Sequence, residues 1–249
     1  FNMEVGDGDR KQLMSGTIDR VDICENGTDV YVRIIDYKTG KKDFNIVKTY
    51  YGIDIQLMVY MEAAMKLVAK MRPGKNVIPA GVFYYNISDP IVSATTESAE
   101  EIEDKIKGEL RLKGMVNSDK DIAEKMDNTE GTSLNIPVSR KADGGFDSRR
   151  SKVMNTEQFN MLGRFVDART VDTADRIAGG DIRRSPYKDG QFSSCDRCPY
   201  GAVCGFSVDL PGCNYRKLKK FDDEVLWNNI EEGVDENGKK MDTGAEERD

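Results

Sequence analysis

The alternation of apolar and polar residues predicts two strands near the start of the chain. Residues 11–24 alternate with the period of a strand, and residues 30–38 form a second, more apolar run. Between them, Asn26-Gly27 is the preferred residue pair for a tight hairpin turn. We therefore predict an antiparallel pair of strands, whose register the pattern leaves open.

A helix and a third strand should follow. Over residues 53–71 the apolar side chains recur at intervals of three and four, which is the spacing of an amphipathic helix. The helix should end before Arg72-Pro73-Gly74. Residues 77–85 are apolar enough for a central strand. These elements predict an α/β fold, with a mixed sheet built from residues 11–85 and flanked by helices.

The second half of the chain is less regular. We predict a charged surface helix over residues 97–113, a short helix over 118–126 and a long helix over 156–178. Ser118 or Asp119 should cap the short helix, and Asn155 or Thr156 the long one. Residues 128–152 are predicted to be irregular or hairpin-like, with a turn at Asp143-Gly144-Gly145. Residues 181–220 contain Gly, Pro and four of the five cysteines, which predicts a small C-terminal appendage.

The polar residues at the end of the second strand are the first candidates for chemistry. Asp36 and Lys38 should share one face of that strand, because successive side chains point to opposite faces. A carboxylate beside an ammonium can bind a hydrated divalent cation and a phosphate, the groups that phosphodiester hydrolysis needs. Asp19, in the paired strand, could lie near them. An Asp-X-Lys sequence alone is far more typical of the solvent-exposed face of a hairpin.

Composition narrows the chemistry further. The chain of 249 residues contains no histidine, which excludes histidine triads, histidine-ligated zinc and imidazole bases. No apolar run reaches the length of a membrane span, and we expect no signal peptide and a cytoplasmic location. The chain opens on Phe1 in the middle of a pattern, so we expect a piece of a longer protein.

The net charge of −7 does not exclude nucleic acid as a partner. Residues 221–249 contain eleven acidic and three basic residues, so this acidic tail holds −8 of the total and the rest is near +1. We predict that the tail is flexible, or docked only through Val225, Leu226 and Trp227. The basic clusters before it are either solvated faces or phosphate contacts. They lie within residues 140–141, 149–152, 183–184 and 216–220.

Three closely spaced cysteines form a second candidate site. Cys195, Cys198 and Cys204 have the spacing of metal or cluster ligands rather than of disulfides in an intracellular chain. Zinc would need a fourth ligand, for which Cys213 is available, and an iron–sulfur cluster also takes thiolates. The spacing leaves both open.

Three ordered motifs together resemble the RecB-type branch of the PD-(D/E)XK nucleases. They are Gly-Thr-Ile-Asp-Arg-Val-Asp at 16–22, Asp-Tyr-Lys-Thr-Gly at 36–40, and Gly-X₃-Gln-X₃-Tyr at 52–60. The resemblance implies a restriction-endonuclease-like core that hydrolyses DNA with Mg²⁺, or with Mn²⁺ in its place. It implies Asp19 and Asp36 as metal ligands with the carbonyl of Tyr37 as the third. It also implies Lys38 as the catalytic lysine, with Gln56 and Tyr60 lining the site near the DNA backbone.

One feature departs from that pattern. Many RecB-type nucleases have a metal-ligating histidine before the first aspartate, and this chain has none. Glu4 is a weak substitute, and a solvated terminal glutamate is an equally good interpretation.

The cysteine segment and the residues after it are similar to the AddB family of helicase–nuclease subunits. In that family three such cysteines join one that lies upstream of the nuclease core to bind a [4Fe–4S] cluster, so the resemblance assigns Cys195, Cys198 and Cys204 to a cluster. Neither Cys24 nor Cys213 matches the fourth ligand, and we expect the cluster to be absent or incomplete in this chain. The implied partners are DNA and an AddA-like subunit. No P-loop motif is present, so we expect no helicase activity.

The predicted division is a nuclease domain at 1–180, a cysteine-rich clasp at 181–220 and the acidic tail at 221–249. The implied function is exonucleolytic processing of double-strand break ends for recombinational repair. Two alternatives remain open. One is another cluster-bearing exonuclease of the RecB type, such as a CRISPR-associated one, and the other is a non-catalytic DNA-binding module with a degenerate site.

Overall fold

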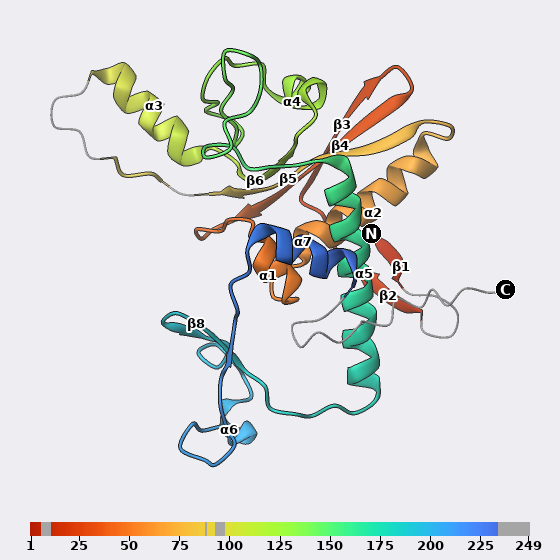
Figure 1. Cartoon of the computed structure of the whole chain (residues 1–249), viewed down its shortest axis with the longest axis vertical. Helices are drawn as coiled ribbons and strands as arrows, with labels where there is room; N and C mark the ends of the chain where they lie inside the picture. Colours follow the sequence, from red (N-terminus) through yellow and green to blue (C-terminus); the bar gives the residue numbers. More distant parts are fainter. Residues whose placement is uncertain (6–10, 88, 93–97, 234–249) are drawn as a thin grey trace.

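The computed structural model describes residues 1–5, 11–87, 89–92 and 98–233. Its centre is a five-stranded mixed sheet in the order β3-β4-β5-β6-β7 (Figure 1). β4 and β5 pair in parallel, as do β6 and β7, whereas β3–β4 and β5–β6 are antiparallel. The strands are β3 (Arg20–Asn26), β4 (Asp29–Lys38), β5 (Asn76–Asn86), β6 (Lys113–Asn117) and β7 (Val153–Met154).

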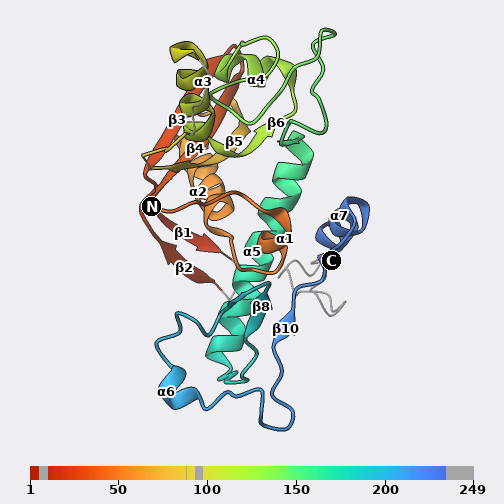
Figure 2. The ribbon, with the colours of Figure 1, turned by 90° about the vertical axis from the view of Figure 1, so that its left-hand side faces the viewer.

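Helices cover both faces of the sheet, as Figures 1 and 2 show. One face packs on α2 (Gln56–Met71) and α5 (Thr156–Ala178), with α1 (Ile46–Tyr50) and α7 (Asp223–Glu231) beside them. The opposite face carries α3 (Ala99–Leu110), α4 (Lys120–Met126) and the irregular residues after α4. Alternation along β4 separates these layers: Ile34 belongs to the core under α2, and Ile35 to the core on the opposite face.

Two small sheets complete the described chain. β1 (Asn2–Val5) and β2 (Gln12–Ser15) form an antiparallel pair. The cysteine-bearing region forms a three-stranded sheet of β8 (Tyr187–Asp189), β9 (Phe192–Ser193) and β10 (Arg216–Lys217), and also contains α6 (Gly201–Cys204). Figure 2 shows this small sheet and α6 near the C-terminal end of α5. Whether residues 181–220 are a separate domain stays a prediction.

Local sequence signals explain several element ends. The predicted hairpin is confirmed: Asn26 pairs with Asp29, and Gly27 takes the positive φ of 62° that the turn requires. α2 ends where predicted, with Arg72 as its C-cap. The predicted long helix is also confirmed, because Asn155 caps α5 by accepting a hydrogen bond from the Gln158 amide.

The prediction of one strand over residues 11–24 is wrong. The chain leaves strand geometry between β2 and β3, because the backbone of Gly16 bonds to the backbone of Phe1 instead of continuing along β4. The Gly16 amide donates to Phe1 O at 3.1 Å, and the Phe1 ammonium donates to Gly16 O at 2.6 Å. β2 therefore joins β1, and only β3 joins the central sheet.

The prediction that residues 11–85 build the sheet is also too narrow. β6 and β7 extend it to Met154, and the predicted helix over 97–113 ends at Leu110, before β6 begins. Gly114 lets β6 approach closely, since a Cβ there would lie 1.9 Å from Val82 O.

Part of the acidic tail is ordered as α7. Leu226 and Ile230 are buried in the main core, and Trp227 packs against it half-buried. Val225, which the sequence predicts to dock with them, is 47% exposed. The flexible tail predicted for the remainder, 234–249, lies outside the described residues. No helix among the described residues is both long and apolar enough to cross a membrane.

Candidate active site

The end of β4 places the Asp-X-Lys pair beneath the start of α2. Asp36 and Lys38 lie on the face that packs on α2, and Ile35 and Tyr37 lie on the other, as the strand period predicts. The difference from a simple surface hairpin is burial, because Asp36 is only 2% exposed. Such a buried carboxylate needs compensation. The Lys38 ammonium provides it, with Nζ 2.5 Å from Asp36 Oδ2.

Gln56 and Tyr60 join this pair through hydrogen bonds. Lys38 Nζ donates to Gln56 Oε1 at 2.9 Å, and Gln56 Nε2 donates to the Tyr60 hydroxyl at 2.8 Å. The two helix residues are one turn apart, at the first and second turns of α2. The structure thus brings four of the predicted site residues into one row: Asp36, Lys38, Gln56 and Tyr60.

Asp19 reaches the same strand from the bend that precedes β3. The pairing of β3 with β4 ends at Arg20 and Ile35, so the Tyr37 amide extends beyond the last backbone partner on that side. Asp19 Oδ2 accepts the hydrogen bond of this amide at 2.9 Å. An exposed carboxylate is thereby held against the residue that follows Asp36.

The carbonyl of Tyr37 points toward the same side as Asp19. Lys38 O accepts a hydrogen bond from the amide of Ile87, just after β5, so the backbone groups of Lys38 face β5. Backbone polar groups of successive strand residues face opposite neighbours. The Tyr37 N–H and C=O therefore both face the β3 side, where Asp19 lies.

A buried polar group beneath the site was not predicted from the sequence. The Tyr84 hydroxyl donates to Asp54 Oδ1 at 2.7 Å, and Lys42 Nζ lies 3.2 Å from Asp54 Oδ2. Tyr84 pairs with Asp36 across β4 and β5, and the ammonium of Lys38 lies 5.8 Å from its ring centroid. Burial, and then the hydrogen bond to Asp54, raise the pKa of Tyr84, which therefore stays a hydrogen-bond donor. In the sequence, the only indication of this buried group is Asp54, a carboxylate between the apolar residues Ile53 and Ile55.

Comparison with known proteins identifies the family. The sequence model of the PD-(D/E)XK nuclease superfamily matches residues 1–205. The chain belongs to this superfamily. This confirms the resemblance drawn from the three motifs and the predicted α/β fold class, with its mixed sheet flanked by helices.

The relatives of this nuclease chain include much longer proteins. It is 37% identical over 229 residues to the B subunit of the ATP-dependent helicase/deoxyribonuclease of Thermoanaerobacter sp. (strain X514), a match that covers 91% of this chain and 20% of that protein. Proteins of the same name from Caldanaerobacter subterraneus subsp. tengcongensis and Lachnoclostridium phytofermentans are 39% and 37% identical over 93% and 96% of the chain, and 20% and 21% of their own length. The chain therefore spans about a fifth of the length of these relatives.

The oxygen atoms around Asp36 suit a hard divalent cation, which nucleases of this superfamily generally use. Asp36 Oδ2 is buried and accepts no hydrogen bond from any described residue, because Lys38 Nζ contacts it outside hydrogen-bond geometry. Small hard cations bind through one or two carboxylates and complete their shell with water or phosphate. Asp36, Asp19 and the carbonyl of Tyr37 fit that requirement. Glu4 instead forms an exposed ion pair with Lys11, with 3.0 Å between Nζ and Oε2.

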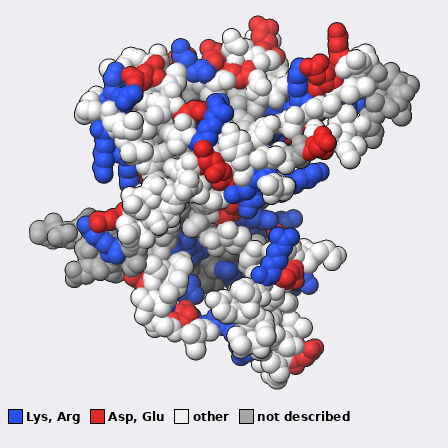
Figure 3. Space-filling view, turned by 180° about the vertical axis from the view of Figure 1, so that it is seen from behind, with Lys and Arg blue, Asp and Glu red and all other residues white. Residues whose placement is uncertain are grey.

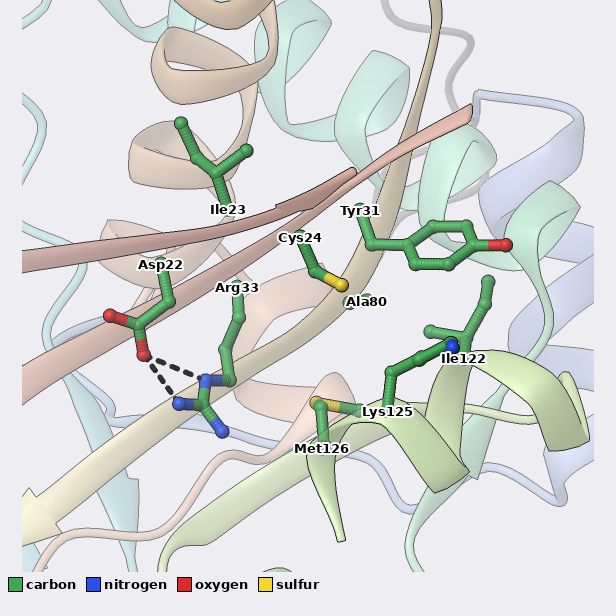
Figure 4. Close-up of a pocket in the computed structure, with 9 residues that line it drawn as sticks. All are labelled: Asp22, Ile23, Cys24, Tyr31, Arg33, Ala80, Ile122, Lys125 and Met126. Atoms are coloured by element: carbon green, nitrogen blue, oxygen red, sulfur yellow. Dashed lines mark hydrogen bonds and ion pairs between the residues drawn. The ribbon is translucent and has the colours of Figure 1, made fainter. Parts of the chain in front are cut away.

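The cysteines give a different result. All five lie within the described residues and none forms a disulfide. Within that part of the chain, no three Cys, Asp or Glu side chains are grouped so that they could hold a metal ion. Cys195, Cys198 and Cys204, as arranged in this structure, therefore do not form a ready ligand set. Cys24 lies in β3, in a pocket of about 210 Å³ between β3 and α4 (Figure 4).

The predicted basic clusters include arginines whose side chains bond within the chain. Arg183 is paired with Asp181, Arg184 donates to the carbonyl of Gly205, and Arg140 donates to the carbonyl of Thr129. Arg183 and Arg184 are nevertheless exposed, as Arg149 and Arg150 are.

Sequence reasoning missed a lysine-rich pocket beside the site. Lys41, Lys42 and Lys113 line a hollow of about 220 Å³ next to Asp43 and Glu109. Burial, and then Arg111, lower the pKa of Lys113. Figure 3 shows Lys and Arg side chains gathered around the hollowed middle of the face it presents.

Proposed function

We propose that this chain is a Mg²⁺-dependent deoxyribonuclease domain that hydrolyses phosphodiester bonds at the row formed by Asp36, Lys38, Gln56 and Tyr60. The observation that carries the proposal is the contact between Lys38 and Asp36 at the end of β4, with Asp19 tied to the next amide. A surface hairpin would expose both side chains, whereas here the carboxylate is buried under a helix that supplies two further polar groups. Burial of this kind is costly for stability and is typical of a functional site.

Each residue has a distinct role in this proposal. Asp19, Asp36 and the Tyr37 carbonyl would hold the cation, which when bound supplies charge compensation at the phosphate and a more acidic water. Lys38 places a positive charge where negative charge develops on the phosphate oxygens. Gln56 accepts one hydrogen bond from Lys38, which restricts the ammonium to one direction. Tyr60 keeps the amide of Gln56 in the required orientation.

The wider assignment extends this proposal. The chain would act as the exonuclease domain of an AddB-like subunit in the cytoplasm, paired with an AddA-like subunit. It would digest one strand while double-strand break ends are processed for recombination. The similarity to helicase/deoxyribonuclease subunits supports this assignment. The lysine-rich pocket of Lys41, Lys42 and Lys113 lies just beyond Lys38 and would contact the DNA backbone.

The cysteines remain a prediction within this assignment. Cys195, Cys198 and Cys204 would ligate a [4Fe–4S] cluster in the intact subunit, and the segment would rearrange to bring them together. Anaerobic reconstitution with iron and sulfide, followed by visible absorbance, checks whether this chain alone can hold a cluster. We expect no stable cluster signal from the chain by itself.

Cleavage of end-labelled linear DNA tests the catalytic proposal. With Mg²⁺, Asp36→Ala and Lys38→Ala should each lower the rate by about 10²–10³-fold, the typical effect of removing one group that stabilises transition-state charge. Lys70→Ala, which removes an exposed lysine at the end of α2, should cleave as the wild type does. Thermal unfolding shows whether each variant is folded. Undiminished cleavage by both site variants would refute the assignment, and binding without cleavage by the wild type would indicate a DNA-binding module.

A further inference from the structure

A third pocket opens on the opposite face of β4 from Asp36 and Lys38. It has a volume of about 460 Å³, within the range of small-molecule sites. It lies between the β3–β4 end of the sheet and the chain around the C-terminal end of α3. The residues that give it its chemistry are Arg20, Arg33, Tyr37, Tyr85, Leu112 and Asn135.

Two guanidinium groups in this pocket share one carboxylate. Arg20 Nε lies 2.8 Å from Asp22 Oδ1, and Arg33 Nη2 lies 2.5 Å from Asp22 Oδ2. Figure 4 shows how Arg33 leans against Asp22. The three side chains together carry one net positive charge. Arginine side chains keep their charge at neutral pH, so the pocket is cationic. An anionic ligand is therefore favoured.

The other wall is aromatic and apolar. Tyr37 and Tyr85 meet edge to face, with ring centroids 5.7 Å apart and planes at 77°. The Tyr37 side chain is 38% exposed, which leaves part of its ring free for another planar group. Leu112 adds apolar surface, and the amide of Asn135 adds a polar edge. Aromatic rings beside arginines are the combination that binds bases and phosphates of single-stranded nucleic acid.

Tyr37 links this pocket to the catalytic row through the backbone of β4. Tyr37 stands between Asp36 and Lys38, so the residue that lines this pocket is flanked by the two proposed catalytic residues. A DNA strand whose scissile phosphate lies at Lys38 has to pass the C-terminal end of β4. The nucleotide next to that phosphate can then reach across this end of β4 to the Tyr37 side chain on the other face. A base paired within a duplex cannot enter such a pocket.

We propose that this pocket binds one unpaired nucleotide of the DNA strand being cut, with its base against Tyr37 and Tyr85 and its phosphate at Arg20 and Arg33. This inference rests on the proposed nuclease function. It adds that the DNA strand being cut is held on both faces of β4.

Oligonucleotides carrying 2-aminopurine at successive positions test the pocket without requiring cleavage. In EDTA, the wild type should quench the fluorescence at one position beyond the quenching of the free oligonucleotide, because the base stacks on a ring. Tyr85→Ala should bind single-stranded DNA about five- to tenfold more weakly and lose that quenching, at the low end of the cost of one stacked base. Tyr85→Phe is the matched control, because it keeps the ring. It should retain wild-type affinity and quenching.

Arg33→Gln supplies the second variant, in case Tyr85→Ala does not fold. It should also weaken single-strand binding and flatten its salt dependence, because one phosphate contact is lost. Wild-type affinity and quenching in either folded variant would overturn the proposal. The failure of the nuclease assignment has a different signature: Asp36→Ala would still cleave, whatever the fluorescence shows.

Discussion

The buried hydroxyl of Tyr84 should contribute more to stability than an ordinary tyrosine hydroxyl. In Tyr84→Phe, Asp54 Oδ1 loses the donor that lies 2.7 Å away, and among the residues that the structure describes only Lys42, at 3.2 Å from Oδ2, still compensates the carboxylate. Tyr84 is 0% and Asp54 5% exposed, so water cannot replace the lost donor without opening the core. Removing a hydrogen bond to a buried charge costs about 1.5–3 kcal/mol.

The expected loss is measurable by urea unfolding and by thermal unfolding. For a chain of this size it corresponds to a drop in Tm of about 3–12 °C. Tyr31→Phe is the matched control: its hydroxyl accepts a 3.2 Å hydrogen bond from the exposed Asn26 amide. That neutral bond near the surface should cost less than about 1 kcal/mol. Equal losses in the two variants would refute the reasoning.

The same variant separates support from chemistry. Phenylalanine keeps the ring over which Lys38 lies at 5.8 Å and Lys42 at 5.6 Å. We therefore expect Tyr84→Phe, assayed well below its Tm, to cleave DNA at close to the wild-type rate. A large loss of kcat in the folded variant would mean that the hydroxyl takes part in the reaction.

Three further predictions concern neighbouring parts of the molecule. Gln56→Leu removes the acceptor that orients Lys38, so kcat should fall about tenfold, the equivalent of about 1.4 kcal/mol, with Tm unchanged. An unchanged kcat would show that Gln56 does not orient Lys38 for the reaction. Burial, and then the like charge of Asp167, raise the pKa of Glu62, so its ionised form destabilises the fold above the ordinary pKa. Glu62→Gln should therefore raise Tm at about pH 8. The gain should shrink toward about pH 4, because Glu62 becomes protonated in both the folded and the unfolded state. A difference in Tm that does not depend on pH would contradict this explanation. Leu226→Ala should cost about 2–4 kcal/mol, because Leu226 is 3% exposed. Fluorescence of the single tryptophan, Trp227, reports α7 directly, and unchanged unfolding would show that the helix is not docked.

The elements that sequence predicted well are those specified by local signals. The turn at Gly27-Thr28, between Asn26 and Asp29, closes the hairpin, and the side chain of Asn155 sets the start of α5. Helix spacing alone places Gln56 and Tyr60 one turn apart, and the structure brings Gln56 to Lys38 and Tyr60 to Gln56. In each case the partners lie within a few residues or within one repeat of the secondary structure, so their arrangement hardly depends on the rest of the fold.

The features that sequence did not predict depend on distant contacts. The break between β2 and β3 arises because Gly16 pairs with Phe1, which no alternation pattern records. Similarly, Asp54 looks like a helix-start residue until Tyr84 is placed beneath it. The burial of Asp36 is a third case, because the strand pattern indicated its face but not that α2 would cover it.

The metal site proposed at Asp19 and Asp36 is tested most directly by soaking crystals with Mn²⁺ and measuring anomalous scattering. We expect a peak within bonding distance of both carboxylates and of the Tyr37 carbonyl, and no peak in crystals of Asp36→Asn. A peak elsewhere, an empty site at saturating Mn²⁺, or an undiminished peak in Asp36→Asn would contradict it.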